Sequence, residues 1–446
     1  MATISVSKTT ELQSALKKGG TIEMEPATYI LKSATIPKSD TQFVSANPDK
    51  GQPIILMQAN HPSGPMLNGY NVDGITFENV CLDGNFSNQK GAKRGSSSLV
   101  LCWLRNGEDI SMRNCTVRNS AIDGLKLAAC DNILVEGNTV HDLGHEFVYA
   151  MYDCEDLVFR NNNVKTRTNS AMRGSYGGSN FKIYNNTIWS EIASWSTGPG
   201  MEFDKEMFSN IEIYDNTIKD LNGSGIWFSA DIASCKNVNI HDNIFDNVGN
   251  FLNGKFDYNG YSNAGIAGAG MDGMVIENNV FKNIKLGYAV LMAEAKHAVP
   301  GKYEWIFRNN KLINVNTGFR ISNSRGSVSG SGNSYSCVKL FSNGVTGNIK
   351  VNTGSESPAV KPTDPITPVT PIENTEGTTE VKKVASVKST VIAMGAKGKL
   401  LHVTHDDKPA TEMAVASGTT YDVTVKLLTD TGMYGEGKVS IPLVKR

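Results

Sequence analysis

Three features are scarce in this 446-residue sequence: long apolar runs, an excess of charge, and closely spaced cysteines. No apolar stretch approaches the ~20 residues that a membrane-spanning helix needs. Lys+Arg 43 against Asp+Glu 44 leaves a net charge of −1. This balance disfavours a general nucleic-acid or membrane-surface binder, because no basic excess neutralises phosphates. No signal peptide is visible, since Met1 leads directly into polar sequence; we expect either a mature domain or a protein outside that secretion route.

The cysteines are odd in number and none forms a CxxC pair. This spacing disfavours a zinc site or a thioredoxin-like motif. Several stand at expected strand positions, which favours buried free thiols over disulfides. The seven are Cys81, Cys102, Cys115, Cys130, Cys154, Cys235 and Cys337.

One asparagine-centred phrase recurs at intervals of roughly 23–36 residues, which indicates one structural unit stacked many times. Each interval holds short alternating apolar runs and no long helical pattern, which favours a parallel β-helix over helical solenoids. We expect the stacked amides to bond to one another and to the turn backbone, as structural groups outside any site. The last asparagines of the successive phrases are Asn138, Asn163, Asn186, Asn216, Asn243, Asn279 and Asn310, and Cys115 takes this position one coil earlier.

The composition predicts an all-β chain in four parts. Residues 1–40 form an N-terminal cap and the first strands, with an amphipathic helix at 9–18 that covers the open end of the solenoid. Residues 41–354 form the parallel β-helix, expected to be the catalytic domain. Repeated prolines make 355–380 a Pro/Thr-rich linker. The alternating runs of 381–446 predict a small β-sandwich accessory domain.

The first strand of each coil is expected to form the floor of a site. Side chains alternate between the faces of a strand, so the apolar members should point inward and the others outward. Stacked coils lie ~4.8 Å apart, so the outward residues form a column. The sequence leaves two strand registers possible at Tyr149 and Arg173, which differ by one residue. A shift of one residue would turn these side chains to the opposite face of the strand. The expected outward residues are Lys126, Arg173, Glu202, Asp204, Trp227 and Arg320.

Insertions on both edges of these strands are expected to wall a groove. Aromatic faces beside carboxylates and amines in a long groove suit a sugar polymer, although each aromatic could instead pack its own loop. The wall aromatics are Trp189, Trp195, Phe251, Phe256, Tyr258, Tyr261 and Tyr303. The expected substrate-binding residues are Arg173, Trp227, Tyr149, His145, Lys126, Tyr258 and Lys255.

The sharpest chemical feature is Glu202-Phe203-Asp204. Residues i and i+2 of a strand share a face about 6.5–7 Å apart. This lies within the roughly 6.5–9.5 Å carboxyl separation of an inverting glycosidase, in which one acid protonates the leaving oxygen and the other activates water. Asp231 is an alternative partner. The structural alternative is an exposed acidic strand paired with Arg173 or Lys205.

A second chemistry is β-elimination, in which a base takes the proton beside a uronate carboxyl and a cation holds the developing charge. A set of His145, Tyr149, Arg173 and Lys126 would serve it, while His145 could instead be a hydrogen-bonded turn residue.

A calcium site is the remaining cofactor option. Asp153, Glu155 and Asp156 could bind Ca²⁺, but their spacing matches no known loop. We therefore expect a solvated acidic turn, no metal and no cofactor.

From about residue 140 to 295 the sequence resembles the disaggregatase-associated region of methanogenic archaea of the Methanosarcina type. The phrases that carry the resemblance lie at 167–173, 196–201, 210–216, 223–227, 237–243 and 274–281. The resemblance implies a right-handed parallel β-helix that acts on a chondroitin-like matrix of uronic acid and N-acetylgalactosamine, releasing single cells from aggregates. It supplies no catalytic residues, so Glu202 and Asp204 depend on geometry alone.

Taken together, these observations favour an extracellular or cell-surface enzyme with an acidic polysaccharide as its partner, more a glycoside hydrolase than a polysaccharide lyase. A tailspike-like depolymerase and a non-catalytic carbohydrate-binding adhesin are the alternatives.

Overall fold

The structure, a computed structural model, describes residues 2–95, 98–191, 198–229, 235–250, 263–269, 271–293, 303–322, 325–342 and 348–351, together with the backbone of five strands beyond residue 389. The chain divides into two units, Met1–Lys361 and Pro362–Arg446, each described by itself. Within the described residues, no helix combines the length and apolar character of a membrane span.

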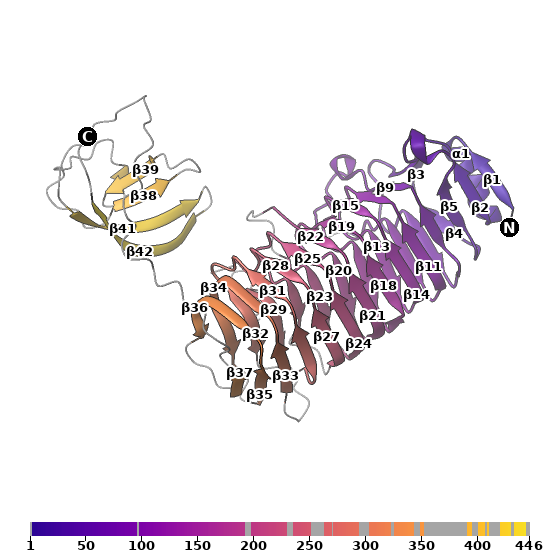
Figure 1. The fold of residues 1–446 in the computed structure, drawn as a ribbon. Coiled ribbons are helices and arrows are strands. Elements are labelled where there is room, and N and C mark those ends of the chain that lie inside the picture. The colour runs from indigo at the N-terminus through magenta and orange to yellow at the C-terminus, as the bar shows by residue number, and fades with distance from the viewer. Residues whose placement is uncertain are drawn as a thin grey trace. The chain divides into compact units, whose positions relative to one another are not determined.

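The first unit is a stack of coils whose neighbouring strands all pair in parallel (Figure 1). Each regular coil contributes three strands. One coil runs through β13 (Leu125–Ala128), β14 (Asp131–Glu136) and β15 (Thr139–His141). The sequence predicted the first two strands and a turn. The third strand escaped prediction because it has three residues and buries one of them, Val140, so it shows no alternating pattern.

The three strands of each coil belong to three stacks of parallel strands, which we call sheets 1, 2 and 3. Sheet 3 holds the first strand of each coil, sheet 1 the second, and sheet 2 the strand after the asparagine turn. Sheets 2 and 3 merge at β34 (Lys311–Ile321) and β36 (Ser334–Phe341).

Sheet 1 contains β1 (Thr3–Val6), β2 (Thr21–Met24), β5 (Gln42–Ser45), β8 (Thr76–Glu78), β11 (Glu108–Arg113), β14, β17 (Cys154–Glu155), β18 (Leu157–Arg160), β21 (Gly178–Tyr184), β24 (Phe208–Tyr214), β27 (Cys235–His241), β30 (Met274–Glu277), β33 (Tyr303–Arg308), β35 (Gly326–Gly330) and β37 (Asn348–Val351). Sheet 2 contains β3 (Thr28–Leu31), β6 (Ile54–Met57), β9 (Cys81–Asp83), β12 (Thr116–Arg118), β15, β19 (Asn163–Lys165), β22 (Thr187–Trp189), β25 (Thr217–Lys219), β28 (Ile244–Asp246) and β31 (Val280–Lys282). Sheet 3 contains β4 (Ala34–Ile36), β7 (Leu67–Tyr70), β10 (Cys102–Arg105), β13, β16 (Val148–Met151), β20 (Met172–Ser175), β23 (Met201–Asp204), β26 (Ile226–Phe228), β29 (Ala264–Ala269) and β32 (Tyr288–Ala293). Two 3-10 turns, Pro48–Lys50 and Phe86–Asn88, complete the set.

The predicted capping helix is confirmed as α1 (Thr9–Lys18), which lies at the N-terminal end of the stack (Figure 1). Its buried residues Leu12, Ala15 and Leu16 join the core of the first coils. The helix therefore covers apolar surface that the first coil would otherwise expose to water.

Inside the coils, one continuous apolar core extends from Val6 to Val351. Like residues stack at the coil spacing: the Phe203 and Phe228 rings lie 4.9 Å apart and nearly parallel. The predicted free thiols are confirmed, because all seven cysteines are unpaired and six are buried.

The predicted asparagine ladder is also confirmed, with one change of register. In each ladder residue the side-chain N–H donates to the amide oxygen of the next coil and to a backbone carbonyl. Asn138 Nδ2 lies 2.8 Å from Asn162 Oδ1, so the ladder passes through Asn162 and not Asn163. The ladder continues beyond the predicted set to Asn333, which accepts from Asn310 at 3.3 Å.

The residue before each ladder asparagine explains the repeated phrase. Gly137 (φ 67°), Asn161 (φ 56°) and Asp215 (φ 52°) are left-handed there. Glycine, asparagine and aspartate tolerate this conformation best, so the repeat carries these residue types at that position.

The second unit, for which the sequence predicts a small β-sandwich, contains antiparallel strands. β38 (Thr390–Met394) pairs with β39 (Leu400–His405), which pairs with β40 (Lys408–Pro409). β41 (Thr420–Thr429) pairs with β42 (Gly432–Pro442). The predicted linker, 355–380, lies outside the described residues.

The ladder predicts a specific stability cost. Asn216 is buried, donates to the Ile183 carbonyl and to Asn243 Oδ1, and accepts from Asn186. Asn216→Ala would leave several buried groups without partners and should lower the free energy of unfolding by on the order of 3 kcal/mol. Urea denaturation measures this change. The control Asn163→Ala removes an exposed amide and should cost less than about 1 kcal/mol; equal costs for the two would contradict a stabilising ladder.

Candidate active site

The outward column predicted for sheet 3 is present and its register is now determined. Successive coils place Trp103, Lys126, Tyr149, Arg173 and Glu202 opposite one another, and Trp227 follows. Tyr149 and Arg173 therefore share the outward face with Lys126. Farther along, Ala267 and Leu291 precede Arg320, so the polar part of the column ends near Trp227.

The centre of this column is a guanidinium surrounded by carboxylates. Arg173 Nε lies 3.3 Å from Asp204 Oδ1, and Nη2 contacts Asp204 Oδ2. Nη2 also lies 3.6 Å from Glu202 Oε1, and Nη1 lies 3.4 Å from Glu146 Oε1. The side chains of Glu202 and Asp204 are 5% and 8% exposed. The acidic strand is thus paired with Arg173, as the structural alternative expected, but it is buried rather than exposed.

A histidine extends the cluster on the N-terminal side. His145 Nδ1 lies 2.8 Å from Asp123 Oδ1 and also contacts Glu146 Oε2. Asp123 and Glu146 are fully buried. Both carboxylates stand on the loops that lead from sheet 2 into sheet 3, immediately before β13 and β16. Neither is among the predicted site residues, although Glu146 is adjacent in sequence to the predicted His145.

The cluster holds more acids than permanent cations, and the pKa values reflect this. Burial raises the pKa of Glu202 to about 8; the field of Arg173 opposes this rise, while Glu146 and Asp204 add to it. Burial also raises the pKa of Glu146, despite His145 and Arg173. Burial alone would lower the pKa of His145, but hydrogen bonds and charge from Asp123 and Glu146 outweigh it and raise the pKa to about 10. At neutral pH the geometry therefore favours a neutral Glu202 and a charged His145.

Next to the carboxylates lies a strip of alternating aromatic and basic side chains. Lys126 Nζ lies 4.9 Å from the Trp103 ring centroid and 5.1 Å from that of Tyr149. The guanidinium carbon of Arg105 lies 4.3 Å from the Trp103 ring centroid, and that of Arg173 lies 5.2 Å from the Tyr149 ring centroid. Trp103 and Arg105 were missed, although the alternation Cys102-Trp103-Leu104-Arg105 matches that of the next coil. We call Trp103, Arg105, Lys126 and Tyr149 the basic strip.

Trp227 takes its predicted place on the column but is 9% exposed and packs with Ala264, Ala267 and Leu291. The other predicted site residues, Asp231, Lys255 and Tyr258, lie outside the described residues, as do the wall aromatics Trp195, Phe251, Phe256 and Tyr261.

The two described wall aromatics are placed differently from the prediction. Trp189 ends β22 on sheet 2, where its Nε1 donates to Asn163 Oδ1 at 2.9 Å. Tyr303 begins β33 on sheet 1 and is buried. Both residues continue the strand pairing of their own coil, so this pairing, and not a loop wall, determines their position.

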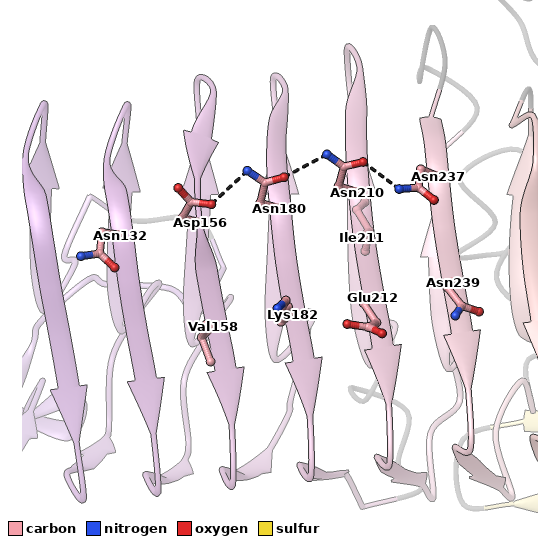
Figure 2. Close-up of a pocket in the computed structure, with 10 residues that line it drawn as sticks. All are labelled: Asn132, Asp156, Val158, Asn180, Lys182, Asn210, Ile211, Glu212, Asn237 and Asn239. Carbon is pink, nitrogen blue, oxygen red and sulfur yellow. Dashed lines mark hydrogen bonds between the residues drawn. The ribbon is translucent and has the colours of Figure 1, made fainter.

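A depression of about 610 Å³ lies on sheet 1, a different face from the column (Figure 2). A second row of amides crosses it: Asn180 donates to Asp156, Asn210 to Asn180, and Asn237 to Asn210, at 2.8–2.9 Å. Lys182, Glu212 and Asn239 lie farther along the same strands.

Asp156 is therefore an acceptor in an amide row, in the turn that the sequence offered as a Ca²⁺ option. Among the described residues, the one group of three potential metal ligands with converging donor atoms is Asp123, His145 and Glu146.

Comparison with known proteins places the chain in context. No curated protein matches it. The exopolygalacturonase of Thermotoga maritima is 9% identical over 75% of this chain and 91% of that chain, with a TM-score of 0.56. The family 28 exopolygalacturonase of Yersinia enterocolitica is 13% identical over 79% of this chain and 78% of that chain, with a TM-score of 0.51. At these identities the likeness concerns the fold.

Two families match the sequence itself. Residues 98–263 match the family described as a right handed beta helix region, and residues 208–367 match the family described as disaggregatase related. The second match begins later than the resemblance seen in the sequence, so Arg173, Glu202 and Asp204 lie in the first match alone. The chain therefore folds as a right-handed parallel β-helix, and its residues 208–367 are similar to the disaggregatase-related family.

Proposed function

We propose that this protein is an enzyme that cleaves an acidic polysaccharide at the carboxylates around Arg173. The observation that carries the proposal is the placement of Glu202 and Asp204 on one outward face of β23, both against Arg173 and beside the basic strip. The disaggregatase-related region supports it. So does the likeness in fold to two proteins named as exopolygalacturonases.

Hydrolysis is the reaction that this arrangement suits best. Glu202 would donate its proton to the glycosidic oxygen as that bond breaks. Asp204, which contacts the Arg173 guanidinium through both carboxylate oxygens, would accept a proton from the water that attacks the anomeric carbon. Asp231, the alternative partner expected from the sequence, stays a candidate outside the described residues.

Arg173 is better suited to positioning than to the substrate-binding role expected from the sequence. Its guanidinium already contacts Glu146, Glu202 and Asp204, so few donors remain for a substrate carboxylate. In this proposal Arg173 orients Asp204 and Glu202 relative to each other.

Two observations favour hydrolysis over β-elimination. Elimination needs a base that accepts a proton near neutral pH. Burial raises the pKa of Tyr149 to about 12, and the pKa of His145 is raised to about 10. Tyr149 therefore holds its own proton and His145 is already protonated, so neither is a free base.

The basic strip is where the acidic sugar would bind. Lys126 has no ion pair among the described residues and lies between two aromatic rings. An ammonium beside aromatic faces suits the carboxylate and ring of a uronic acid residue. We propose a chondroitin-like polymer of uronic acid and N-acetylhexosamine in a cell-surface matrix, cleaved outside the cell so that aggregates disperse.

The acid and base roles predict large losses of turnover. Glu202→Gln and Asp204→Asn should each lower kcat by about 10²–10⁴-fold, the usual contribution of a general acid or base. Reducing ends and the ultraviolet absorbance of unsaturated uronates are followed together on chondroitin, polygalacturonate and an uncharged dextran. Reducing ends without absorbance are expected for the unchanged protein.

The control is Glu212→Gln, which removes a carboxylate on sheet 1 and should leave kcat unchanged. Cleavage that survives both site substitutions would contradict the assignment. Absorbance that rises with reducing ends would indicate elimination. Retained polymer binding without any turnover would favour the adhesin alternative.

The raised pKa of Glu202 predicts an alkaline limit for the reaction. Its pKa of about 8 means that the proton needed by the leaving group is lost above that pH, so kcat/KM should fall there. The groups facing Glu202 are Arg173, Asp204, Glu146 and His145. The folded protein holds the Glu202 proton more tightly than the unfolded chain, in which the pKa of this side chain is near 4.5. The stability that protonated Glu202 contributes is therefore fully present below pH 4.5 and is lost as the pH rises through about 8.

Circular dichroism at each pH separates this loss of stability from the loss of the acid. A profile of kcat/KM that stays flat from pH 7 to pH 9, with folding intact, would rule out Glu202 as the proton donor.

The basic strip predicts a binding defect that depends on charge. Lys126→Gln should raise KM for an acidic polymer about fivefold, equivalent to about 1 kcal/mol, while kcat changes little. The defect should shrink at high salt, because salt screens the lost attraction. Lys182→Gln on sheet 1 is the matched control; equal effects from both lysines would indicate a non-specific charge effect.

A further inference from the structure

A cluster of three potential ligands lies at the N-terminal edge of the carboxylate site. Asp123, His145 and Glu146 each offer one atom, and these atoms lie within 4.8 Å of one another. The three residues come from two loops, before β13 and before β16, that lie side by side because those strands pair in register. Strand pairing therefore holds the ligands together across 22 residues of sequence.

We propose that Asp123, His145 and Glu146 form a binding site for a divalent cation of the zinc class. This inference does not depend on the proposed catalytic function.

Burial and unsatisfied oxygens point to a ligand at this place. Asp123 and Glu146 are fully buried. Asp123 Oδ2 has no hydrogen-bond donor. Glu146 Oε2 lies against His145 Nδ1, and Asp123 Oδ1 lies 2.8 Å from the same nitrogen. A buried carboxylate oxygen without a donor is costly, and a cation among these atoms would remove that cost.

The charge of the whole cluster favours the same ligand. Four buried carboxylates, those of Asp123, Glu146, Glu202 and Asp204, surround one permanent cation, Arg173. A divalent ion bound on the His145 side would supply positive charge next to Asp123 and Glu146, while Arg173 serves Glu202 and Asp204.

The donor types select the metal. An imidazole nitrogen with two carboxylates suits zinc or a similar transition metal better than Ca²⁺ or Mg²⁺, which prefer oxygen alone. Tetrahedral zinc with bonds of about 2.0–2.2 Å separates its ligand atoms by roughly 3.4 Å, so both carboxylate oxygens would move away from His145 Nδ1 to admit the ion. Three protein ligands leave a fourth position open. Glu146 would join the ion to Arg173, because its other oxygen, Oε1, lies 3.4 Å from Nη1.

The test measures metal binding directly, on the full chain purified without a histidine tag and stripped with a chelator. Zn²⁺, Mn²⁺ and Ca²⁺ are titrated by calorimetry, and the bound metal is counted after desalting. We expect about one Zn²⁺ per chain, with Ca²⁺ binding far more weakly. Asp123→Asn and His145→Gln should each weaken Zn²⁺ binding by at least about 10-fold.

A matched control is present on sheet 1. His241 also contacts two carboxylates, with Nδ1 at 2.8 Å from Asp242 and Nε2 at 3.5 Å from Glu212. These two carboxylates are much more exposed than those of Asp123 and Glu146. His241→Gln should leave Zn²⁺ binding unchanged. Unchanged Zn²⁺ binding in His145→Gln, or loss of binding in His241→Gln, would overturn the proposal.

A second measurement covers variants that fail to fold. Co²⁺ added to the unchanged protein should give the intense visible absorption of a four-coordinate site, and Zn²⁺ should abolish it. The absence of both Zn²⁺ uptake and this absorption would overturn the proposal and leave His145 as a buried cation between two carboxylates.

Discussion

The register between successive coils is the constraint on which the rest of this structure depends. Parallel strand pairing and the buried amide ladder hold each coil at one position relative to the next. A slip of one residue would turn every outward side chain of a strand into the core. Since the register holds, residues 22–31 positions apart meet in the site: His145 and Asp123, Arg173 and Glu146, Arg173 and Asp204.

The site then follows from electrostatics in a buried place. Four carboxylates cannot all be charged there beside one arginine, because burial disfavours each charge and the acids repel one another. At Glu202, burial and the neighbouring Glu146 and Asp204 together raise the pKa to about 8. The same excess of negative charge explains why His145 holds a proton so firmly and why its neighbourhood suits a divalent ion. The proposed acid chemistry, arginine positioning and cation binding would thus all follow from this one excess of carboxylates.

Much of the fold was predictable because its signals are periodic. The asparagine phrase, the alternating strands and the capping helix each appear as local patterns, and Glu202 and Asp204 were found from a spacing of two. Groups outside such patterns were missed. Sheet 2 has strands too short to alternate, and Asp123 and Glu146 lie on loops that meet only through strand pairing. The choice between Asn162 and Asn163 needed the left-handed residue at Asn161, which a run of three asparagines conceals. The burial of Glu202 and Asp204 depends on neighbouring coils and has no signature in the strand itself.

The two amide rows described above have opposite directions. In the buried ladder, each side-chain N–H donates toward the C-terminal end, as from Asn138 to Asn162. In the exposed row on sheet 1, donation runs toward the N-terminal end, from Asn237 through Asn210 and Asn180 to Asp156. A carboxylate can only accept, so Asp156 determines the orientation of every amide behind it. The amide dipoles of the two rows therefore oppose each other along the axis, so the exposed row offsets part of the electric polarity that the buried ladder accumulates coil by coil.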